Sequence, residues 1–382
     1  MGEQQEGRLL QLLRQMEKQG IGEDNPVRSQ LYNEYLDGES RQAGVPRMGV
    51  FELTPLCNLD CKMCYVHLQK DQLRGASLLT GEQWIGLMQE AIDAGMLSAQ
   101  LSGGEAMMHP DFDEIYLFLY ERGIRITVMT NGILLTDKRI AFFQKYRPAA
   151  IQITLYGGSD DAYERVTGHR MYERVTGNIV KAKEIGCRLT ITATPSHYFG
   201  VEDVKFASEF CKKHDLRLLV NAELNEAREE TGRSIDDFDL PEEDYLAIQE
   251  VMVPKENRTP IPACDLPCPG NNQEPVCGMR CAAGRSLFCV KWTGKMQICL
   301  DIDHAIDPGQ VGFAKAWKEL HNFALAYPMP AECRDCAYSS ICTICPVLHA
   351  KGALAGHADR RICARTKKLV EAGYRRLPQE KA

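Results

Sequence analysis

Three cysteines near residue 60 have the types and spacing of an iron–sulfur site. Cys57, Cys61 and Cys64 stand in the run TPLCNLDCKMCY, at the spacing C-x3-C-x2-C. Four thiolates normally complete a [4Fe–4S] cluster, so three leave one iron open to bind a further ligand. An open iron indicates chemistry more than structural support. A structural zinc site is the alternative, although zinc sites more often show C-x2-C pairs.

The same motif, placed at the end of a predicted strand, resembles the signature of the radical S-adenosylmethionine (SAM) enzymes. The resemblance implies that the three thiolates hold a [4Fe–4S] cluster whose open iron chelates SAM. It also implies that electron transfer to SAM releases a 5′-deoxyadenosyl radical.

Six β/α units follow one another from residue 48. Strands are expected at 49–54, 98–101, 125–129, 150–155, 188–193 and 217–222. Amphipathic stretches separate them, and Thr80 with Gln83 and Asp111 with Glu114 are predicted to form capping boxes. Repeated β/α units imply parallel strands with right-handed crossovers. Because a closed barrel needs eight units, we expect an α/β fold with an open, partial (β/α)6 TIM-like barrel, as the radical SAM resemblance also implies.

The cysteine loop follows the first predicted strand, and glycine-bearing turns follow the next three, namely SGGE at 102–105, TNG at 130–132 and YGG at 156–158. These strand ends are where the active site of a β/α barrel lies. The turn SGGE resembles the family's GGE motif, so Gly103, Gly104 and Glu105 are expected to hold the amino group of SAM. Taken alone, each of these glycine-bearing turns is better explained as a tight turn.

The resemblance assigns three more residues to SAM. Met63 matches a hydrophobic position near adenine, with plain core packing as the alternative. Thr154 stands where the family often has a serine near the ribose. Arg170, or Arg165, could meet the carboxylate bidentately, with an exposed helix-entry arginine as the alternative.

The C-terminal part of the chain is rich in cysteine and resembles the SPASM extension of radical SAM enzymes. The supporting pattern is Cys281-x12-Gly294-x4-Cys299, then the cysteines from 333 to 345, then Cys363. The resemblance implies two fully ligated auxiliary [4Fe–4S] clusters, and therefore three clusters in all. One would use Cys277, Cys281, Cys299 and Cys345; the other would use Cys333, Cys336, Cys342 and Cys363.

Two features of this part fit the pattern less well. Cys264 and Cys268 are left over, and they could replace Cys277, ligate substrate or be buried thiols. Asp301 is offset by one residue from the aspartate that follows the matching cysteine in sulfatase-maturating relatives. It is the candidate catalytic base, although a shift of one residue on a strand turns a side chain to the other face.

The length of 382 residues predicts more than one domain. We expect an N-terminal helical extension at 1–45, the partial barrel at 46–225, an acidic linker at 226–260 and the SPASM domain at 261–382. A net charge of −7 without a basic cluster argues against nucleic-acid binding. The sequence has no signal peptide or membrane-length apolar run, so sixteen cysteines predict a metal-binding cytoplasmic protein.

The combined pattern predicts a radical SAM/SPASM enzyme that abstracts hydrogen from a ribosomally made peptide and leaves a crosslink or an oxidised residue. It would need an external electron donor such as flavodoxin or ferredoxin, and a separate leader-recognition protein could present the peptide. Oxidation or epimerisation of a small molecule such as a carbohydrate is the alternative. An iron–sulfur electron carrier or a zinc-binding scaffold is the non-enzyme alternative.

Overall fold

The computed structural model describes residues 26–66, 68, 73, 78–222, 224, 238–253, 281–300, 302–327, 330–334, 336–339, 341–342, 358, 360–375 and 377. Three predicted site residues, Cys277, Asp301 and Cys345, lie outside these ranges, as do Cys264 and Cys268.

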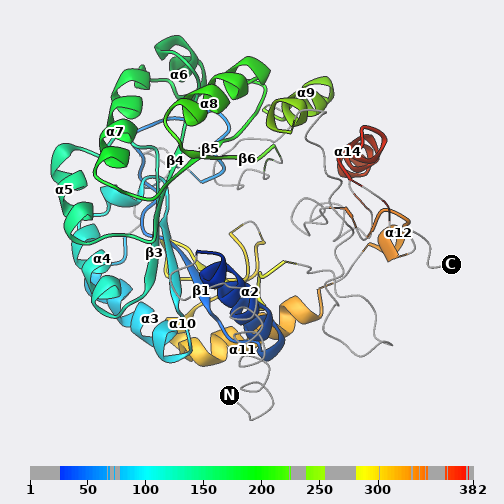
Figure 1. Cartoon of the computed structure of the whole chain (residues 1–382). Coiled ribbons are helices and arrows are strands. Elements are labelled where there is room, and N and C mark those ends of the chain that lie inside the picture. The colour runs from blue at the N-terminus through cyan, green and yellow to red at the C-terminus, as the bar shows by residue number, and fades with distance from the viewer. Residues whose placement is uncertain are drawn as a thin grey trace.

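A single curved sheet forms the centre of the described structure (Figure 1). Its order is β6-β5-β4-β3-β2-β1-β7-β8-β9, and every pair from β6 to β7 is parallel. The two outer strands, β6 and β9, do not pair with each other, so the expected open barrel is confirmed. The strands are β1 Met48–Glu52, β2 Ser98–Ser102, β3 Arg125–Thr130, β4 Ala150–Thr154, β5 Leu189–Ala193, β6 Arg217–Val220, β7 Leu287–Val290, β8 Met296–Gln297 and β9 Ala305–Ile306.

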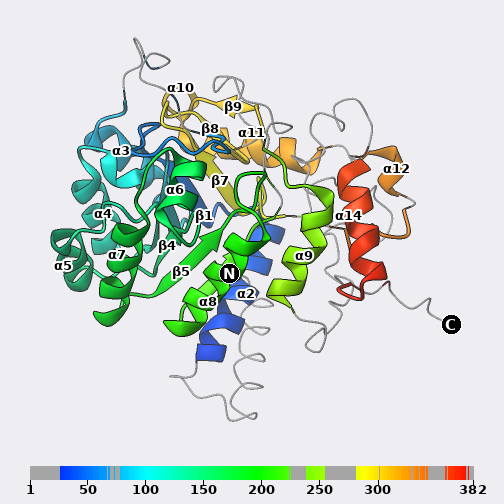
Figure 2. The same ribbon diagram turned by 90° about the horizontal axis from the view of Figure 1, so that it is seen from above.

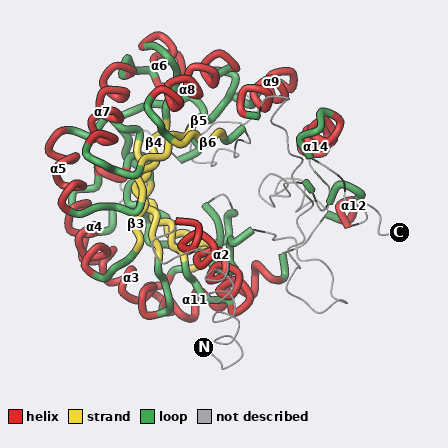
Figure 3. Tube along the Cα trace, viewed as in Figure 1, coloured by secondary structure: helices red, strands yellow, loops and turns green. Residues whose placement is uncertain are grey.

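Helices cover the outer, convex face of this sheet (Figure 3). Those that connect its first six strands are α3 Gly81–Asp93, η1 Ala106–Met108, α4 Phe112–Glu121, α5 Asp137–Lys145, α6 Asp160–Thr167, α7 Tyr172–Glu184 and α8 Val201–Lys213. The others are α2 Pro26–Ala43, α9 Glu242–Met252, α10 Pro308–Val311, α11 Phe313–Leu325, α12 Ala331–Arg334 and α14 Arg360–Glu371. Within the described ranges, no helix combines the length and apolar character needed to cross a bilayer.

The two faces of the sheet differ in polarity because side chains alternate along each strand. Leu101, Val128 and Ile151 are fully buried beneath the helices. The alternate positions of the central strands are mostly polar and half-buried, and parallel register aligns them, as it does Gln152 with Thr190. A closed barrel would fill this inner face with branched apolar side chains. The concave face of the open barrel is therefore suited to contact a polar ligand.

One of the two predicted capping boxes is present. Thr80 accepts from the backbone N–H of Gln83 at 3.3 Å, and the Gln83 side chain accepts from the Thr80 N–H at 2.9 Å. The predicted capping box at Asp111 was wrong, because the Asp111 side chain makes no capping hydrogen bond to its own helix, α4. Its carboxylate instead accepts from the N–H of Gly81 at 2.8 Å, which joins the start of α4 to the start of α3.

The C-terminal half contributes strand β7 to the barrel sheet, which the sequence did not predict. β7 pairs in parallel with β1, and its Phe288 ring lies edge-on to Phe51 at 5.7 Å. Phe288 also packs against Phe313 of α11 at 5.1 Å. The N–H of Phe313 donates to Glu90 of α3 at 3.0 Å. The sheet and its helical cover therefore continue beyond the expected boundary at residue 261.

At the open side, α9 and α14 pack against each other (Figure 2). Arg365 of α14 donates to the Asp239 carboxylate at 3.2 Å, just before α9. The hydroxyl of Tyr374 donates to Glu250 of α9 at 3.0 Å. These contacts attach the cysteine-bearing helix α14 to the segment that follows the sixth strand.

Candidate functional site

The loop that carries Cys57, Cys61 and Cys64 is fastened to the turn after β2 by backbone hydrogen bonds. The N–H of Gly104 donates to the carbonyl of Thr54, and the N–H of Glu105 donates to that of Leu56, each at 2.8 Å. A Cβ atom at Gly103 would lie 2.3 Å from the Thr54 oxygen, and one at Gly104 would lie 2.4 Å from the Leu56 oxygen. Only glycine permits this approach, so these two glycines position the cysteine loop.

The same loop is also fastened to the end of α6. The N–H groups of Asp60 and Lys62 donate to the carbonyls of Thr167 and Val166, at 3.1 and 3.0 Å. These carbonyls have no partner within a helix that stops there. Gly168 ends α6 in the left-handed conformation, with φ at 74°. The helix end therefore presents its last carbonyl groups to the cysteine loop.

Glu105 is fully buried and joins two strand ends. Its carboxylate accepts from the hydroxyl of Thr130 and the N–H of Asn131, both at 2.9 Å, and from the N–H of Met107 at 3.3 Å. Burial raises its pKa to about 7, against the effect of these donors. The side chain predicted to meet SAM is thus held by protein groups between β2 and β3.

Asn131, in the turn after β3, continues this network to the cysteines. Its side-chain amide donates to the sulfur of Cys57 at 3.8 Å and to the side-chain oxygen of Asn58 at 2.6 Å. The chain from Glu105 through Asn131 therefore ends on a predicted cluster ligand.

The three thiols lie close enough to influence one another and a neighbouring phenol. Burial raises the pKa of Cys57 to about 12, and the charges of Glu105 and Cys64 contribute further. Burial also raises the pKa of Tyr156, which lies in the turn after β4. Its hydrogen-bonded neighbour Cys61 raises this pKa further, and so do the charges of Cys57 and Cys64. Because Cys57 stays protonated when free, a bound metal would have to displace its proton.

The donor set fits a three-thiolate cluster, although the side chains are not yet in coordination geometry. Across the described ranges, no three Cys, His, Asp or Glu side chains are arranged to hold a metal ion. The backbone of the loop that carries all three thiols is fixed by hydrogen bonds to its neighbours. Soft thiolates are the ligands that iron–sulfur clusters use.

The other predicted SAM residues differ in their placement. Thr154 is half-buried at the end of β4, in register with Thr192 of β5. The Thr192 hydroxyl is buried without a hydrogen-bond partner, so this part of the concave face has a polar group to offer a ligand. Met63 is buried in the main apolar core. Arg170 lies in the loop between α6 and α7. Its side chain is exposed and forms ion pairs with the carboxylates of Asp161 and Glu164 on α6.

Four of the predicted auxiliary ligands come together in the C-terminal part: Cys333, Cys336, Cys342 and Cys363. Burial raises the pKa of Cys333, and the three other thiols raise it further. Thr366, one turn after Cys363 on α14, donates its hydroxyl to the sulfur of Cys342 at 3.4 Å. Of the other predicted set, Cys281 is exposed and Cys299 is half-buried against the main core.

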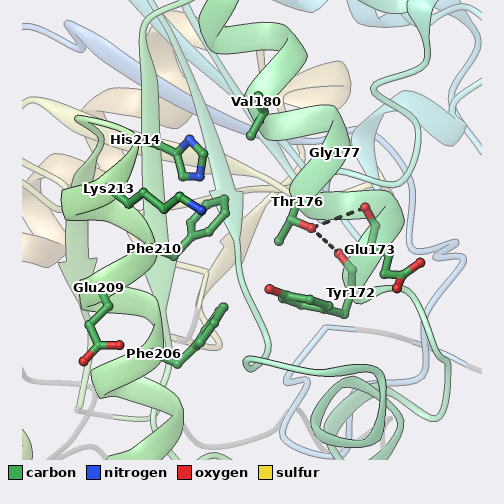
Figure 4. Close-up of a pocket in the computed structure, with 10 residues that line it drawn as sticks. All are labelled: Tyr172, Glu173, Thr176, Gly177, Val180, Phe206, Glu209, Phe210, Lys213 and His214. Carbon is green, nitrogen blue, oxygen red and sulfur yellow. Dashed lines mark hydrogen bonds between the residues drawn. The ribbon is translucent and has the colours of Figure 1, made fainter.

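A separate groove of about 570 Å³ lies on the outer helical layer between α7 and α8 (Figure 4). Aromatic side chains, including Tyr172 and Phe206, line it, and Gly177 leaves one wall without a side chain. It contains no residue of the cysteine loop, so it is distinct from the candidate site.

Sequence reasoning noted the turns that contain Asn131 and Tyr156 but gave neither residue a role, and it did not single out Thr192. The available signal was position, because each lies at or near the carboxyl end of a parallel strand. The contacts of Asn131 and Tyr156 with the thiols join residues more than seventy positions apart in the sequence, such as the 74 positions between Asn131 and Cys57.

The part of the chain that carries the cysteine loop is similar to known proteins. Residues 51–210 match the model of the radical SAM superfamily. PqqA peptide cyclase of Bradyrhizobium diazoefficiens is 27% identical over 151 residues, 39% of each chain. GTP 3′,8-cyclase of Aliarcobacter butzleri is 25% identical over 182 residues, 46% of this chain and 54% of that protein. The matches therefore span 39% to 54% of these relatives' own lengths.

A solved structure extends the likeness of fold. SuiB of Streptococcus suis, bound to S-adenosylmethionine, superposes with a TM-score of 0.63 at 19% identity, covering 94% of this chain and 87% of that one. SuiB has also been solved with its precursor peptide SuiA, at a TM-score of 0.62 and 18% identity, covering 89% and 85%. The family match at 51–210 contains the three-thiol loop, the SGGE turn and the polar ends of β3 to β5, and this part of the chain is a radical SAM domain.

Proposed function

We propose that the chain is a radical SAM/SPASM enzyme that abstracts hydrogen from a ribosomally made peptide and leaves a crosslink or an oxidised residue. The observation that carries the proposal is the three-thiol loop, fixed by the fold at the strand ends of an open barrel whose inner face is polar. A carrier of electrons would need no such concave face beside its cluster.

A radical SAM domain implies a [4Fe–4S] cluster and SAM. Cys57, Cys61 and Cys64 would hold the cluster, which with SAM supplies the 5′-deoxyadenosyl radical. The Gly103–Glu105 turn would adjoin the amino group of SAM, and Thr154 with the unpaired Thr192 hydroxyl would adjoin its ribose. Met63 and Arg170 complete the proposed set, although the ion pairs of Arg170 would have to open.

A peptide substrate is favoured by two of the proteins to which the chain is similar. One is named a PqqA peptide cyclase, and SuiB has been solved with the precursor peptide SuiA. The similarity to a GTP 3′,8-cyclase favours the alternative of a small-molecule substrate. Both kinds of substrate therefore have to be assayed.

The C-terminal third, 261–382, would be a SPASM domain with two further [4Fe–4S] clusters. Cys333, Cys336, Cys342 and Cys363 would bind one of them, which fits their proximity. Cys277, Cys281, Cys299 and Cys345 would bind the other. An auxiliary cluster would accept the second electron from the substrate. Asp301 would act as base, flavodoxin or ferredoxin would supply electrons, and a separate protein could recognise the leader.

The decisive experiment measures 5′-deoxyadenosine after anaerobic reconstitution with iron, sulfide, SAM and dithionite. The wild type should form it, and a variant with Cys57, Cys61 and Cys64 all changed to Ala should not. Cys187→Ala is the matched control, because Cys187 belongs to no proposed site and should leave cleavage unchanged. Stoichiometric zinc in protein purified without oxygen would contradict the proposal.

Two further arms address substrate and auxiliary clusters. A short peptide encoded beside the gene should lose two hydrogens by mass spectrometry on incubation with the enzyme. Consumption of a carbohydrate or nucleotide instead would favour the small-molecule alternative. Cys336→Ala should still cleave SAM with external reductant but form little product. Full product from a folded variant without auxiliary clusters would show that those clusters are structural.

A further inference from the structure

Asn131 is held in one orientation by the turn in which it lies. Its backbone N–H donates to the buried Glu105 carboxylate at 2.9 Å, and its side-chain oxygen accepts from the N–H of Ile133 at 3.0 Å. Turning the amide by 180° would place an NH2 group against the Ile133 N–H. The amide nitrogen must therefore face away from its own turn.

Both hydrogen bonds of this amide nitrogen end on the cysteine loop. They go to the Cys57 sulfur at 3.8 Å and the Asn58 oxygen at 2.6 Å. These two bonds do not hold the turn itself together. The turn is closed instead by the N–H of Gly132, which donates to the Thr130 hydroxyl oxygen, and by the N–H of Ile133, which donates to the Asn131 side-chain oxygen. Asn131 is 6% exposed, so water does not compete strongly for these donors. The side chain is thus a buried, oriented donor toward a predicted iron ligand.

We propose that Asn131 is a positioning residue that donates an N–H···S hydrogen bond to the cluster-bound Cys57 thiolate and makes the cluster easier to reduce. This inference rests on the proposed function, since it requires a cluster on Cys57. Reduction adds negative charge to the cluster and its sulfurs, and a fixed donor stabilises that charge more than it stabilises the oxidised form. The buried Glu105 carboxylate fixes the donor's backbone, so it supports Asn131 without touching the sulfur.

The test is the reduction potential of the cluster whose electron paramagnetic resonance (EPR) signal changes when SAM is added. This criterion selects the open cluster even if others are present. In Asn131→Ala the equilibrium constant for one-electron reduction should fall about tenfold, equivalent to about 59 mV toward more negative potential. Asn131→Asp keeps the acceptor for Ile133 but replaces the donor with negative charge, so its potential should fall further.

Asn178→Ala is the matched control. Asn178 also donates its side-chain amide to the turn after β3, at 2.9 Å to the Gly132 carbonyl, but this bond does not reach the cysteine loop. Its removal should loosen the same turn and leave the potential unchanged. An equal shift in both alanine variants would overturn the proposal, because it would then reflect the turn and not the donor.

A second measurement needs no variant. Wild-type protein labelled with ¹⁵N in asparagine side chains should show a ¹⁵N coupling to the reduced cluster by pulsed electron–nuclear double resonance, and its absence would also overturn the inference. Wild-type protein without iron at this site, or without SAM cleavage, would instead contradict the proposed function. Normal SAM cleavage with an unshifted potential in both Asn131 variants would reject the role of Asn131 alone.

Discussion

The two groups of cysteines in the described structure are held in different ways. The loop with Cys57, Cys61 and Cys64 is fastened by backbone hydrogen bonds to the turn after β2 and to the end of α6, within the main apolar core. The group around Cys333 and Cys342 packs with Ala358 in a small separate cluster. Two of its four thiols, those of Cys333 and Cys363, lie on the four-residue α12 and in the first turn of α14.

This difference indicates how each site is organised. A loop fixed by its fold can present three thiols and keep one iron open without relying on the metal for its shape. A small cysteine group with little apolar surface must obtain much of its stability from the metal it binds. The first arrangement suits a reactive centre, and the second suits a fully ligated one.

Removing iron should reveal the largest difference in stability between the two cysteine-bearing parts of the chain. Anaerobic treatment of reconstituted protein with a chelator should unfold the segment around Cys333–Cys363, because structural metals contribute on the order of 10 kcal/mol to such sites. The barrel, with its own core, should remain folded. Limited proteolysis checks this: cleavage should begin after α11 while a fragment covering β1 to β6 persists. Equal rates of cleavage in both parts would contradict the comparison.

A single methyl group should disable the first site and spare the second. In Gly104→Ala the new Cβ would lie 2.4 Å from the Leu56 carbonyl oxygen, in backbone that cannot move aside cheaply. We expect a loss of about 3 kcal/mol in the free energy of unfolding, at the upper end for overpacking. Iron analysis should show loss of the SAM-responsive cluster with the remaining iron retained. Loss of all iron together would mean that the two sites are not independent.

The six barrel strands could be predicted because their signal is local. Predicted starts differ from the observed ones by at most one residue, as for 49–54 against Met48–Glu52. Apolar alternation marks each strand, and Gly95 and Gly123 mark helix ends with positive φ. The cysteine motif is equally local, which is why the first candidate site could be proposed from the sequence.

What the sequence could not predict depends on contacts between distant residues. Strands β7 to β9 have two to four residues each, and their alignment depends on β1, more than two hundred residues away. The carboxylate of Asp111 was expected to cap its own helix but bonds to Gly81, thirty residues before it. The route from Glu105 through Asn131 to Cys57 likewise exists only after the strand ends meet.

The stability of the protein should depend on pH through Glu105, the buried carboxyl group beside the first cysteine group. The pKa of Glu105 is raised to about 7 from an ordinary value of 4.5, so the folded chain binds this proton more tightly than the unfolded chain does. Stability from this group is therefore greatest at low pH and falls as pH rises from 4.5 through 7. Between about pH 5.5 and pH 8 the wild type should lose roughly 2 kcal/mol relative to Glu105→Gln, which cannot titrate there.

Urea unfolding of both proteins at the two pH values measures this difference. Replacing the carboxylate could also lower the free energy of unfolding of Glu105→Gln by the same amount at both pH values. The informative quantity is therefore how the difference between the two proteins changes with pH. If the difference between the two proteins is the same at both pH values, Glu105 does not titrate in this range.

The smallest effect concerns the helix end that supports the cysteine loop. The hexapeptide YERVTG occurs at 163–168 and 172–177, but its two glycines differ in conformation. Gly168 ends α6 with φ at 74°, whereas Gly177 lies inside α7 beside the groove of Figure 4. A Cβ at either position would meet nothing within 4 Å, so backbone conformation alone should decide the outcome.

Glycine-to-alanine substitution at these two positions should therefore change the free energy of unfolding in opposite directions. Gly168→Ala should lower the free energy of unfolding by about 1 kcal/mol, because alanine is strained in the left-handed region. Gly177→Ala should raise it by roughly 0.5–1 kcal/mol, because alanine favours a helix interior. Urea midpoints measure both changes, and only Gly168→Ala should also weaken iron retention at Cys57, Cys61 and Cys64. If both variants keep that iron equally, the end of α6 does not help to hold the cysteine loop, and the loop depends on the turn after β2 and on Asn131.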